Sequence, residues 1–197
     1  MNQATAWGDA VSRADTTSDG CRPQRVAVVG TTGSGKTTLA RQISTIRGIP
    51  HIELDALHWG PDWTPTPIGL FRDRTAQALS EEFWVVDGNY SKVRDIVWGR
   101  ADAVVWMDFS LPVIMGRLIW RTFSRIFTRE ELWSGNRERL WDQLFTSDSL
   151  FLYAFRTYRR RRREYAQLLG QPEHAHLTTV HLPSPHAARQ WLAGLAQ

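Results

Sequence analysis

The sequence predicts an α/β fold in which a five-stranded, mostly parallel sheet is covered by helices on both faces. Five short apolar runs alternate with longer segments in which apolar residues recur at helical spacing. Most of these runs are continuously apolar, as expected for strands that are buried on both faces. The chain has 197 residues, of which 42% are hydrophobic and 22% are charged. This is enough for one domain with its own core.

The first unit reads as strand, glycine loop and helix, because the apolar run 26–29 stops at Gly30 and helical spacing follows over 37–46. A second strand is predicted at 51–55, where Ile52 and Leu54 share one face. Three prolines make 59–67 irregular. The remaining predictions are helix 68–80, strand 83–86, strand 103–108, helix 111–127, helix 139–169, strand 178–182 and helix 185–195.

The rest of the chain sets limits on domain organisation and location. Residues 1–24 are polar and predict a disordered tail, so the domain spans 25–197. The only cysteine, Cys21, cannot form an internal bridge and is typical of a reducing, cytoplasmic protein. The most apolar stretch is interrupted by Asp108, Pro112 and Arg117, so we expect no membrane span.

One motif carries the chemistry. The segment Gly30-Thr31-Thr32-Gly33-Ser34-Gly35-Lys36-Thr37 matches the phosphate-binding loop G-x-x-x-x-G-K-[ST] at a strand-to-helix junction. Glycines allow backbone N–H groups to converge on phosphates, and the next helix adds positive potential. The motif predicts a P-loop NTPase fold with three α/β/α layers. The predicted ATP contacts are Gly30, Thr31, Thr32, Gly33, Ser34, Gly35, Lys36, Thr37 and Thr38.

A magnesium ion is expected beside the nucleotide. The Thr37 hydroxyl is one predicted ligand, and the second is an acid at the end of a neighbouring strand. Asp87 fits this role, because it ends an apolar run and Gly88 permits a sharp exit. Asp108 also follows an apolar run, but we interpret it as the start of a turn before a helix.

Three further segments carry a family resemblance: Leu54-Asp55-Ala56-Leu57-His58-Trp59, Val86-Asp87-Gly88-Asn89-Tyr90 and Leu132-Trp133-Ser134-Gly135-Asn136-Arg137-Glu138. With the phosphate loop, they make the chain resemble the adenylate-kinase-like branch of small P-loop kinases. The chain more closely resembles the adenylate-kinase-related proteins often labelled DNA topology modulation proteins. The similarity runs from about Arg25 to the end of the chain.

This resemblance implies roles for arginines that precede a mobile lid. In adenylate kinases one arginine stacks on adenine and a second, one turn later, contacts phosphates; Arg117 and Arg121 match these positions. We therefore expect Arg121 to stabilise charge on the transferred phosphoryl group. The implied lid is the arginine-rich segment of about 122–139, and closing it would exclude water. Arg125 and Arg129 within it fit either function or a solvated surface.

The phosphoryl acceptor is less defined. Monophosphate kinases carry Phe-Pro-Arg after the strand, whereas Asn89-Tyr90-Ser91 stands here. Arg72, Arg74 or Arg94 would have to replace the missing arginine. Shikimate and gluconate kinases place an acid where Asp55 stands, and that acid holds the acceptor hydroxyl. Asp55 is thus a candidate catalytic orienter or base, and a helix N-cap is the open alternative.

A phosphate loop occurs in three relevant classes of protein: phosphotransferases, nucleic-acid-binding ATPases and GTPases. We favour a phosphotransferase that uses Mg²⁺ and ATP on a small-molecule acceptor. A nucleic-acid-binding ATPase is the alternative, because Arg156 and the run 159–163 form a basic segment among 22 arginines. Arg162 falls on the apolar stripe between Tyr158 and Tyr165, which suggests a guanidinium turned towards the nucleotide. A GTPase is excluded, because neither Lys36 nor Lys92 follows an asparagine.

Overall fold

The computed structural model describes residues 23–128 and 150–196. Its centre is a sheet in which all five strands are parallel, in the spatial order β2-β3-β1-β4-β5. The strands are β1 (Arg25–Gly30), β2 (His51–Glu53), β3 (Trp84–Asp87), β4 (Ala103–Met107) and β5 (Thr178–Leu182). The predicted α/β fold is confirmed. The tail residues 1–22 and the lid residues 129–139 lie outside the described residues.

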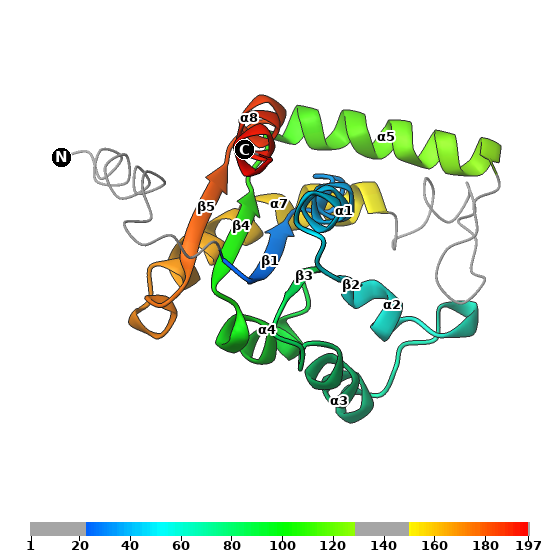
Figure 1. Ribbon diagram of the computed structural model, residues 1–197. Coiled ribbons are helices and arrows are strands. Elements are labelled where there is room, and N and C mark those ends of the chain that lie inside the picture. The colour runs from blue at the N-terminus through cyan, green and yellow to red at the C-terminus, as the bar shows by residue number, and fades with distance from the viewer. Residues whose placement is uncertain (1–22, 129–149, 197) are drawn as a thin grey trace.

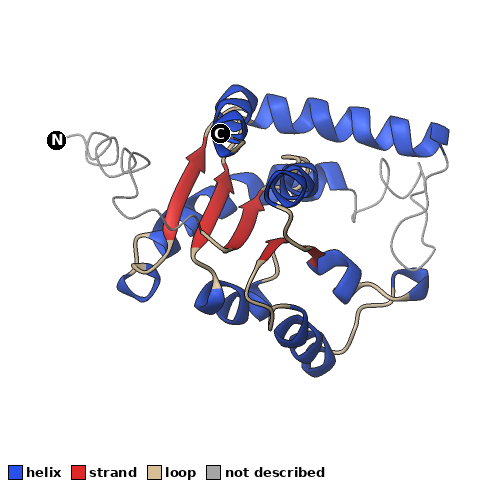
Figure 2. Ribbon diagram, in the orientation of Figure 1, coloured by secondary structure: helices blue, strands red, loops and turns tan. Residues whose placement is uncertain are grey.

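Helices cover both faces of the sheet and form the outer layers (Figures 1 and 2). Helices α1, α5 and α8 pack on one face, and α2, α3, α4 and α7 supply residues to the other core. Their bounds are α1 Lys36–Arg47, α2 Leu54–His58, α3 Ile68–Ala78, α4 Arg94–Arg100, α5 Leu111–Thr128, α7 Leu150–Leu169 and α8 Pro185–Leu195. None of these described helices is both long and apolar enough to span a membrane.

The alternation of side chains along β1 divides the core in two. Val26 and Val28 join the cluster under α1 and α5, whereas Ala27 and Val29 join the cluster that contains Trp84 and Trp98. Successive strand residues point to opposite faces, so a continuously apolar strand feeds both layers. Each fully buried large apolar side chain adds about 1.5–3 kcal/mol of stability.

The structure differs from the predicted elements in two places. Strand β2 ends at Glu53, and Leu54 begins a short helix, so Asp55 is not a strand residue as expected. Asp55 is not the N-cap of this helix either, because the N-cap position is Glu53. The structure also contains α4, which the pattern did not reveal. Of the long helix expected over 139–169, the described part is α7.

The strand order places a ligand site at one edge of the sheet. Strand β1 lies between β3 and β4, and the helices that follow these two strands, α4 and α5, pack on opposite faces of the sheet. In open α/β sheets, ligands bind at the carboxyl ends of the strands where the connections diverge in this way. The phosphate loop follows β1 at this edge (Figure 1).

Candidate active site

The loop between β1 and α1 has the backbone of a phosphate cradle. Gly30, Gly33 and Gly35 adopt φ values of 152°, 84° and 94°. A Cβ atom on Gly30 would lie 2.6 Å from the Met107 carbonyl oxygen, and one on Gly35 would lie 2.9 Å from Arg117 Nη1. No side chain caps the N-terminus of α1, so its first N–H groups are available to an anion. The loop therefore fits a phosphate chain.

Lys36 lies in a ring of charges at the start of α1. Its Nζ donates to the Thr31 carbonyl oxygen across the loop at 3.4 Å. Burial lowers the pKa of Lys36 to about 8, although the charges of Asp87 and Asp55 oppose this shift. The cationic Arg161 and Arg121 lower the same pKa further. Two acids and two arginines therefore act on this ammonium group, which matches a site built for a multiply charged anion.

Thr37, Asp87 and His51 form a hydrogen-bonded row across α1, β3 and β2. Thr37 Oγ1 donates to Asp87 Oδ2 at 2.7 Å, and His51 Nε2 lies 2.8 Å from Asp87 Oδ1. Asp87 is buried, and β2 and β3 pair in a register that sets Glu53 beside it. A hydroxyl and a carboxylate within contact distance are the oxygen ligands that Mg²⁺ prefers. The predicted pair thus fits magnesium, and His51 is a partner that the sequence did not reveal.

Asn89 connects the loop to the far end of the chain. Its side chain accepts from the Gly30 N–H at 3.3 Å and from Tyr165 Oη at 2.9 Å, and it donates to the Gly30 carbonyl oxygen. Burial raises the pKa of Tyr165 to about 12, so this hydroxyl keeps its proton. Asn89 follows β3 in sequence, but its two partners lie 59 and 76 residues away.

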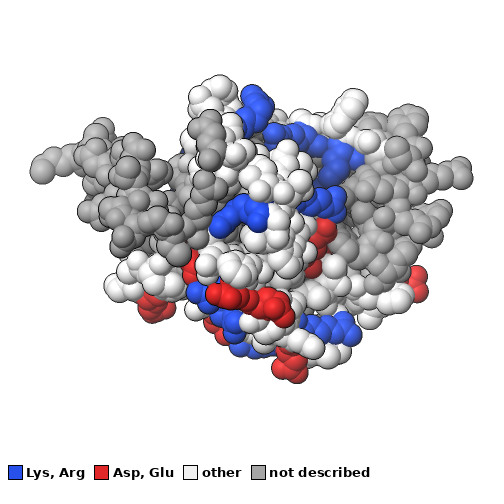
Figure 3. All heavy atoms as spheres, in the orientation of Figure 1, with Lys and Arg blue, Asp and Glu red and all other residues white. Residues whose placement is uncertain are grey.

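Helix α5 brings two predicted arginines to the loop. Arg117 Nη1 donates to the Ser34 carbonyl oxygen at 2.6 Å, and its guanidinium lies 5.0 Å from the centre of the Phe109 ring. Burial and the charge of Arg189 lower the Arg117 pKa. Arg121 stands one turn further along and acts on Lys36. On the face shown in Figure 3, Lys and Arg atoms gather over the first half of α5. That Arg117 stacks on adenine stays a prediction.

Helix α7 contributes a different arginine from the one expected. Arg162 Nε donates to Asp108 Oδ2 at 3.0 Å, and the Arg162 side chain is 53% exposed. The charge that reaches Lys36 belongs to Arg161. Asp108 is buried and also lies 3.0 Å from His181 Nε2, so it ties β4 to β5 and α7. Asp108 lies between β4 and α5, as expected for a residue that begins the turn, and its side chain also binds Arg162 and His181.

Asp55 lies in the first turn of α2. Tyr90 Oη donates to Asp55 Oδ1 at 2.5 Å, and the charge of the Asp55 carboxylate raises the pKa of Lys36. The arginines considered as acceptor contacts are mostly engaged elsewhere: Arg72 binds both carboxylate oxygens of Asp95, and Arg94 binds Glu164. The site thus offers a carboxylate, but neither of these two arginines, to an acceptor.

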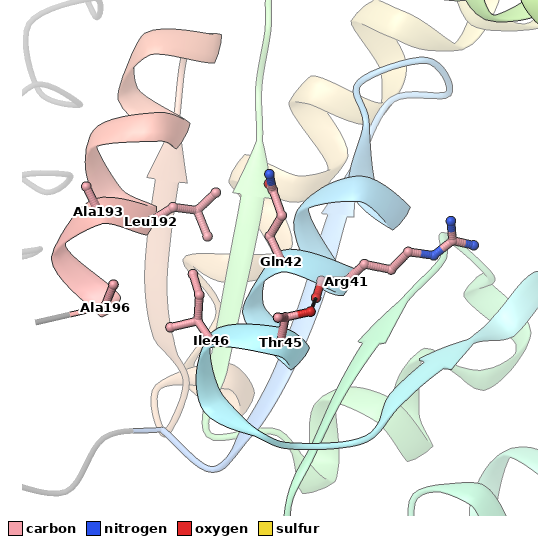
Figure 4. Close-up of a pocket in the computed structure, with 7 residues that line it drawn as sticks. All are labelled: Arg41, Gln42, Thr45, Ile46, Leu192, Ala193 and Ala196. Atoms are coloured by element: carbon pink, nitrogen blue, oxygen red, sulfur yellow. Dashed lines mark hydrogen bonds between the residues drawn. The ribbon is translucent and has the colours of Figure 1, made fainter.

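A surface groove lies away from this site. An open groove of about 430 Å³ runs between the second half of α1 and the end of α8 (Figure 4). Arg41 points away from α8 in this view, and it pairs with Glu53 at 2.6 Å. The groove is lined by Arg41, Gln42, Thr45, Ile46, Leu192, Ala193 and Ala196. None of these residues belongs to the phosphate loop, so the groove is separate from the candidate site.

Comparison with known proteins identifies the fold. No protein-family model matches the sequence, and no curated protein matches it. A gluconokinase structure from Sinorhizobium meliloti is 23% identical, with a TM-score of 0.50 over 88% of this chain and 92% of the other. A shikimate kinase from Acinetobacter baumannii, solved with shikimate, is 18% identical, with a TM-score of 0.51 over 88% and 91%. A shikimate kinase from Bacteroides thetaiotaomicron is 16% identical, with a TM-score of 0.51 over 88% and 96%. The chain therefore has the three-layer α/β/α fold found in these P-loop kinase structures.

Proposed function

We propose that the chain is an ATP-dependent phosphotransferase that moves the γ-phosphoryl group of Mg-ATP to a hydroxyl group of a small molecule. One observation carries this proposal. Lys36, Thr37 and Asp87 meet at the end of β1, and Asp55 lies within electrostatic reach of Lys36. A carboxylate that is oriented by a tyrosine hydroxyl can hold and deprotonate an acceptor hydroxyl. The fold shared with solved gluconokinase and shikimate kinase structures supports the proposal by analogy.

Each residue has a defined role in this reaction. The loop N–H groups and Lys36 hold the β- and γ-phosphates, while Thr37 and Asp87 hold Mg²⁺. Arg117 lies beside the nucleotide, and Arg121 neutralises charge on the transferred group. Magnesium, when bound, polarises the phosphoryl oxygens.

The acceptor side completes the transfer. The acceptor oxygen forms a bond to the γ-phosphorus as the bond to the bridging β–γ oxygen breaks, and ADP leaves. Asp55 orients the acceptor hydroxyl and receives its proton. Because Tyr90 donates to one Asp55 oxygen, the carboxylate has a fixed orientation, and its other oxygen accepts the proton.

The finer assignments are also proposals. The three shared segments and the phosphate loop support membership of the adenylate-kinase-related group, and the single cysteine supports a cytoplasmic location. A nucleic-acid-binding ATPase is the second candidate, since Arg156, Arg159, Arg160 and Arg163 are exposed on α7. Binding to DNA that weakens steeply with salt and stimulates hydrolysis would favour it.

The direct test uses ATP labelled at the γ position. Purified protein is incubated with Mg²⁺ and pools of nucleosides, nucleoside monophosphates and hydroxylated metabolites, and the label is followed into products. We expect label in an organic phosphate ester and expect Asp55→Asn to abolish it while nucleotide affinity stays within about twofold. Label that appears only as free phosphate in every pool would contradict transfer.

A further inference from the structure

A cluster of aromatic rings is connected to Asp55 through Tyr90. The His58 ring lies 4.7 Å from Trp59, 4.8 Å from Phe71 and 4.6 Å from Tyr90, measured between ring centres. Phe71 is fully buried behind this group, and the other rings are half-buried. We call these four rings, His58, Trp59, Phe71 and Tyr90, the aromatic wall. Tyr90 belongs to this wall and also donates the hydrogen bond to Asp55. An aromatic surface therefore starts directly at the carboxylate that would hold the acceptor.

A further ring, that of Trp63, packs against Trp59, and the backbone there adopts a strained conformation. Asp62 and Trp63 have φ values of 53° and 55°, which are unusual for residues other than glycine and especially for a bulky one. Their conformation sets Trp63 edge-on to Trp59 with 5.8 Å between ring centres. Strain of this kind costs about 1–3 kcal/mol per residue and is concentrated at ligand clamps and other functional sites. The fold thus holds Trp63 in this position although its backbone conformation is locally unfavourable.

Two arginines near Asp55, Arg72 and Arg94, are already paired with acids. Arg72 gives both of its terminal nitrogens to Asp95, and it also donates to the Lys92 carbonyl oxygen at 2.6 Å. Arg94 is engaged by Glu164 at 2.6 Å and lies over the Trp98 ring. Burial lowers the pKa of His58, the charge of Asp55 opposes this shift, and the charge of Lys92 adds to it. A phosphate or carboxylate on the acceptor would meet Asp55 without either arginine to balance it.

We infer that the acceptor is a neutral hydroxyl compound with a flat ring, of the nucleoside or aromatic-alcohol type. This inference rests on the proposed kinase function and specifies its substrate. The ring lies against the Trp59 and Trp63 side of the wall, and the hydroxyl reaches Asp55. Aromatic faces bind flat rings by stacking, while a repelled or unbalanced charge discriminates against anionic relatives.

Matched pairs of acceptors test the inference. Each pair contains a neutral ring compound and the same ring bearing an acidic group: a nucleoside with its 5′-monophosphate, and an aromatic alcohol with its ring carboxylate. Transfer from γ-labelled ATP is measured for both members. We expect kcat/KM for one neutral compound to exceed that of its anionic partner by at least about tenfold. The two pairs distinguish the nucleoside from the aromatic-alcohol source.

Two variants test whether the ring of the acceptor binds beside Trp63 and its hydroxyl beside Asp55. Trp63→Ala is expected to raise the acceptor KM about tenfold with the ATP KM unchanged, and Tyr90→Phe is expected to lower kcat through Asp55. Phe83→Ala is the matched control, because Phe83 is 42% exposed at the opposite end of β3. It should change neither constant.

The outcomes distinguish failure of the acceptor inference from failure of the proposed kinase function. Preference for the anionic members, for a cationic amino alcohol, or for compounds without a ring would overturn the inference and leave the kinase proposal standing. An unchanged acceptor KM in Trp63→Ala would also overturn it. Release of free phosphate alone in every arm would reject the proposed function itself.

Discussion

His51 Nε2 lies 2.8 Å from Oδ1 of Asp87, the carboxylate whose other oxygen accepts from Thr37. Both side chains are almost fully buried, with 11% and 4% of their surface exposed. The carboxylate is therefore fixed from two sides, by a hydroxyl on α1 and by an imidazole on β2. Partners that orient a metal-binding carboxylate commonly change metal affinity by about 10–100-fold when they are removed.

His51→Ala is accordingly expected to raise the Mg²⁺ concentration needed for half-maximal nucleotide binding by about tenfold. His51→Gln, whose amide can donate to the same oxygen, should restore most of the affinity. The measurement is a Mg²⁺ titration with a fluorescent ATP analogue. His186→Gln, at an exposed histidine on α8, is the control. An unchanged magnesium midpoint in His51→Ala would show that His51 only fills space.

The low pKa of Lys36, about 8, predicts proton uptake on nucleotide binding. Phosphates beside Lys36 favour its charged form and raise this pKa. Binding at pH 8 should take up about half a proton, and binding at pH 6.5 almost none. Calorimetry at pH 8 in buffers of different ionisation enthalpy measures the uptake. Lys36→Arg keeps its charge throughout this range, so uptake that persists in this variant would exclude Lys36 as its source.

The same group affects the stability of the nucleotide-free chain. The folded-state pKa of about 8 lies below the ordinary value of 10.5, so the unfolded chain binds this proton more tightly. Its contribution to the free energy of unfolding therefore rises as the pH increases between these two values. The Lys36→Met variant should lack this rise in urea titrations at pH 7.5 and 9.5. A rise of equal size in both proteins would contradict the assignment.

Gly30→Ala should destabilise the domain and abolish nucleotide binding. The added Cβ would lie 2.6 Å from the Met107 carbonyl oxygen, and φ at this residue is 152°. We expect a loss of more than about 2 kcal/mol in the free energy of unfolding, measured in urea. Gly116→Ala is the matched control, because an added Cβ inside α5 meets nothing within 4 Å. It should stabilise by about 0.5–1 kcal/mol.

Arg161 and Arg162 are adjacent on α7 but should behave differently. Arg161→Ala is expected to weaken nucleotide binding about tenfold, because its charge acts at Lys36. Arg162→Ala should leave binding within about twofold and cost no more than about 1 kcal/mol of stability, since the Arg162 side chain is half-exposed and His181 still contacts Asp108. Binding and urea titrations on both variants measure this contrast. Weaker binding in Arg162→Ala than in Arg161→Ala would contradict the geometry.

The sequence predicted the elements that depend on local pattern. The apolar runs of β1, β3, β4 and β5 and the loop motif were sufficient to place the sheet and the phosphate cradle. The sequence also predicted that Thr37 and Asp87 lie together at the strand ends, and they are in hydrogen-bond contact; their role as magnesium ligands stays a prediction. Asp55 was placed on a strand, since the alternation of Ile52 and Leu54 continues into what becomes a helix.

Contacts between distant segments could not be predicted. Arg161 and Arg162 both lie three or four residues from Tyr158 or Tyr165, so helical spacing alone does not decide which one faces the loop. Asp108 needed His181 and Arg162 to reveal its role, and these residues are 73 and 54 positions away. The same holds for Asn89 and Tyr165. The contacts of these residues depend on the order of the strands in the sheet, and a single sequence does not give that order directly.

The most direct measurement is the affinity of the purified chain for Mg-ATP beside that of Lys36→Ala. We predict saturable binding by the parent, with at least about a hundredfold loss in the variant and unchanged folding by circular dichroism. A parent that binds no magnesium nucleotide, or a variant that binds as tightly as the parent, would contradict the account.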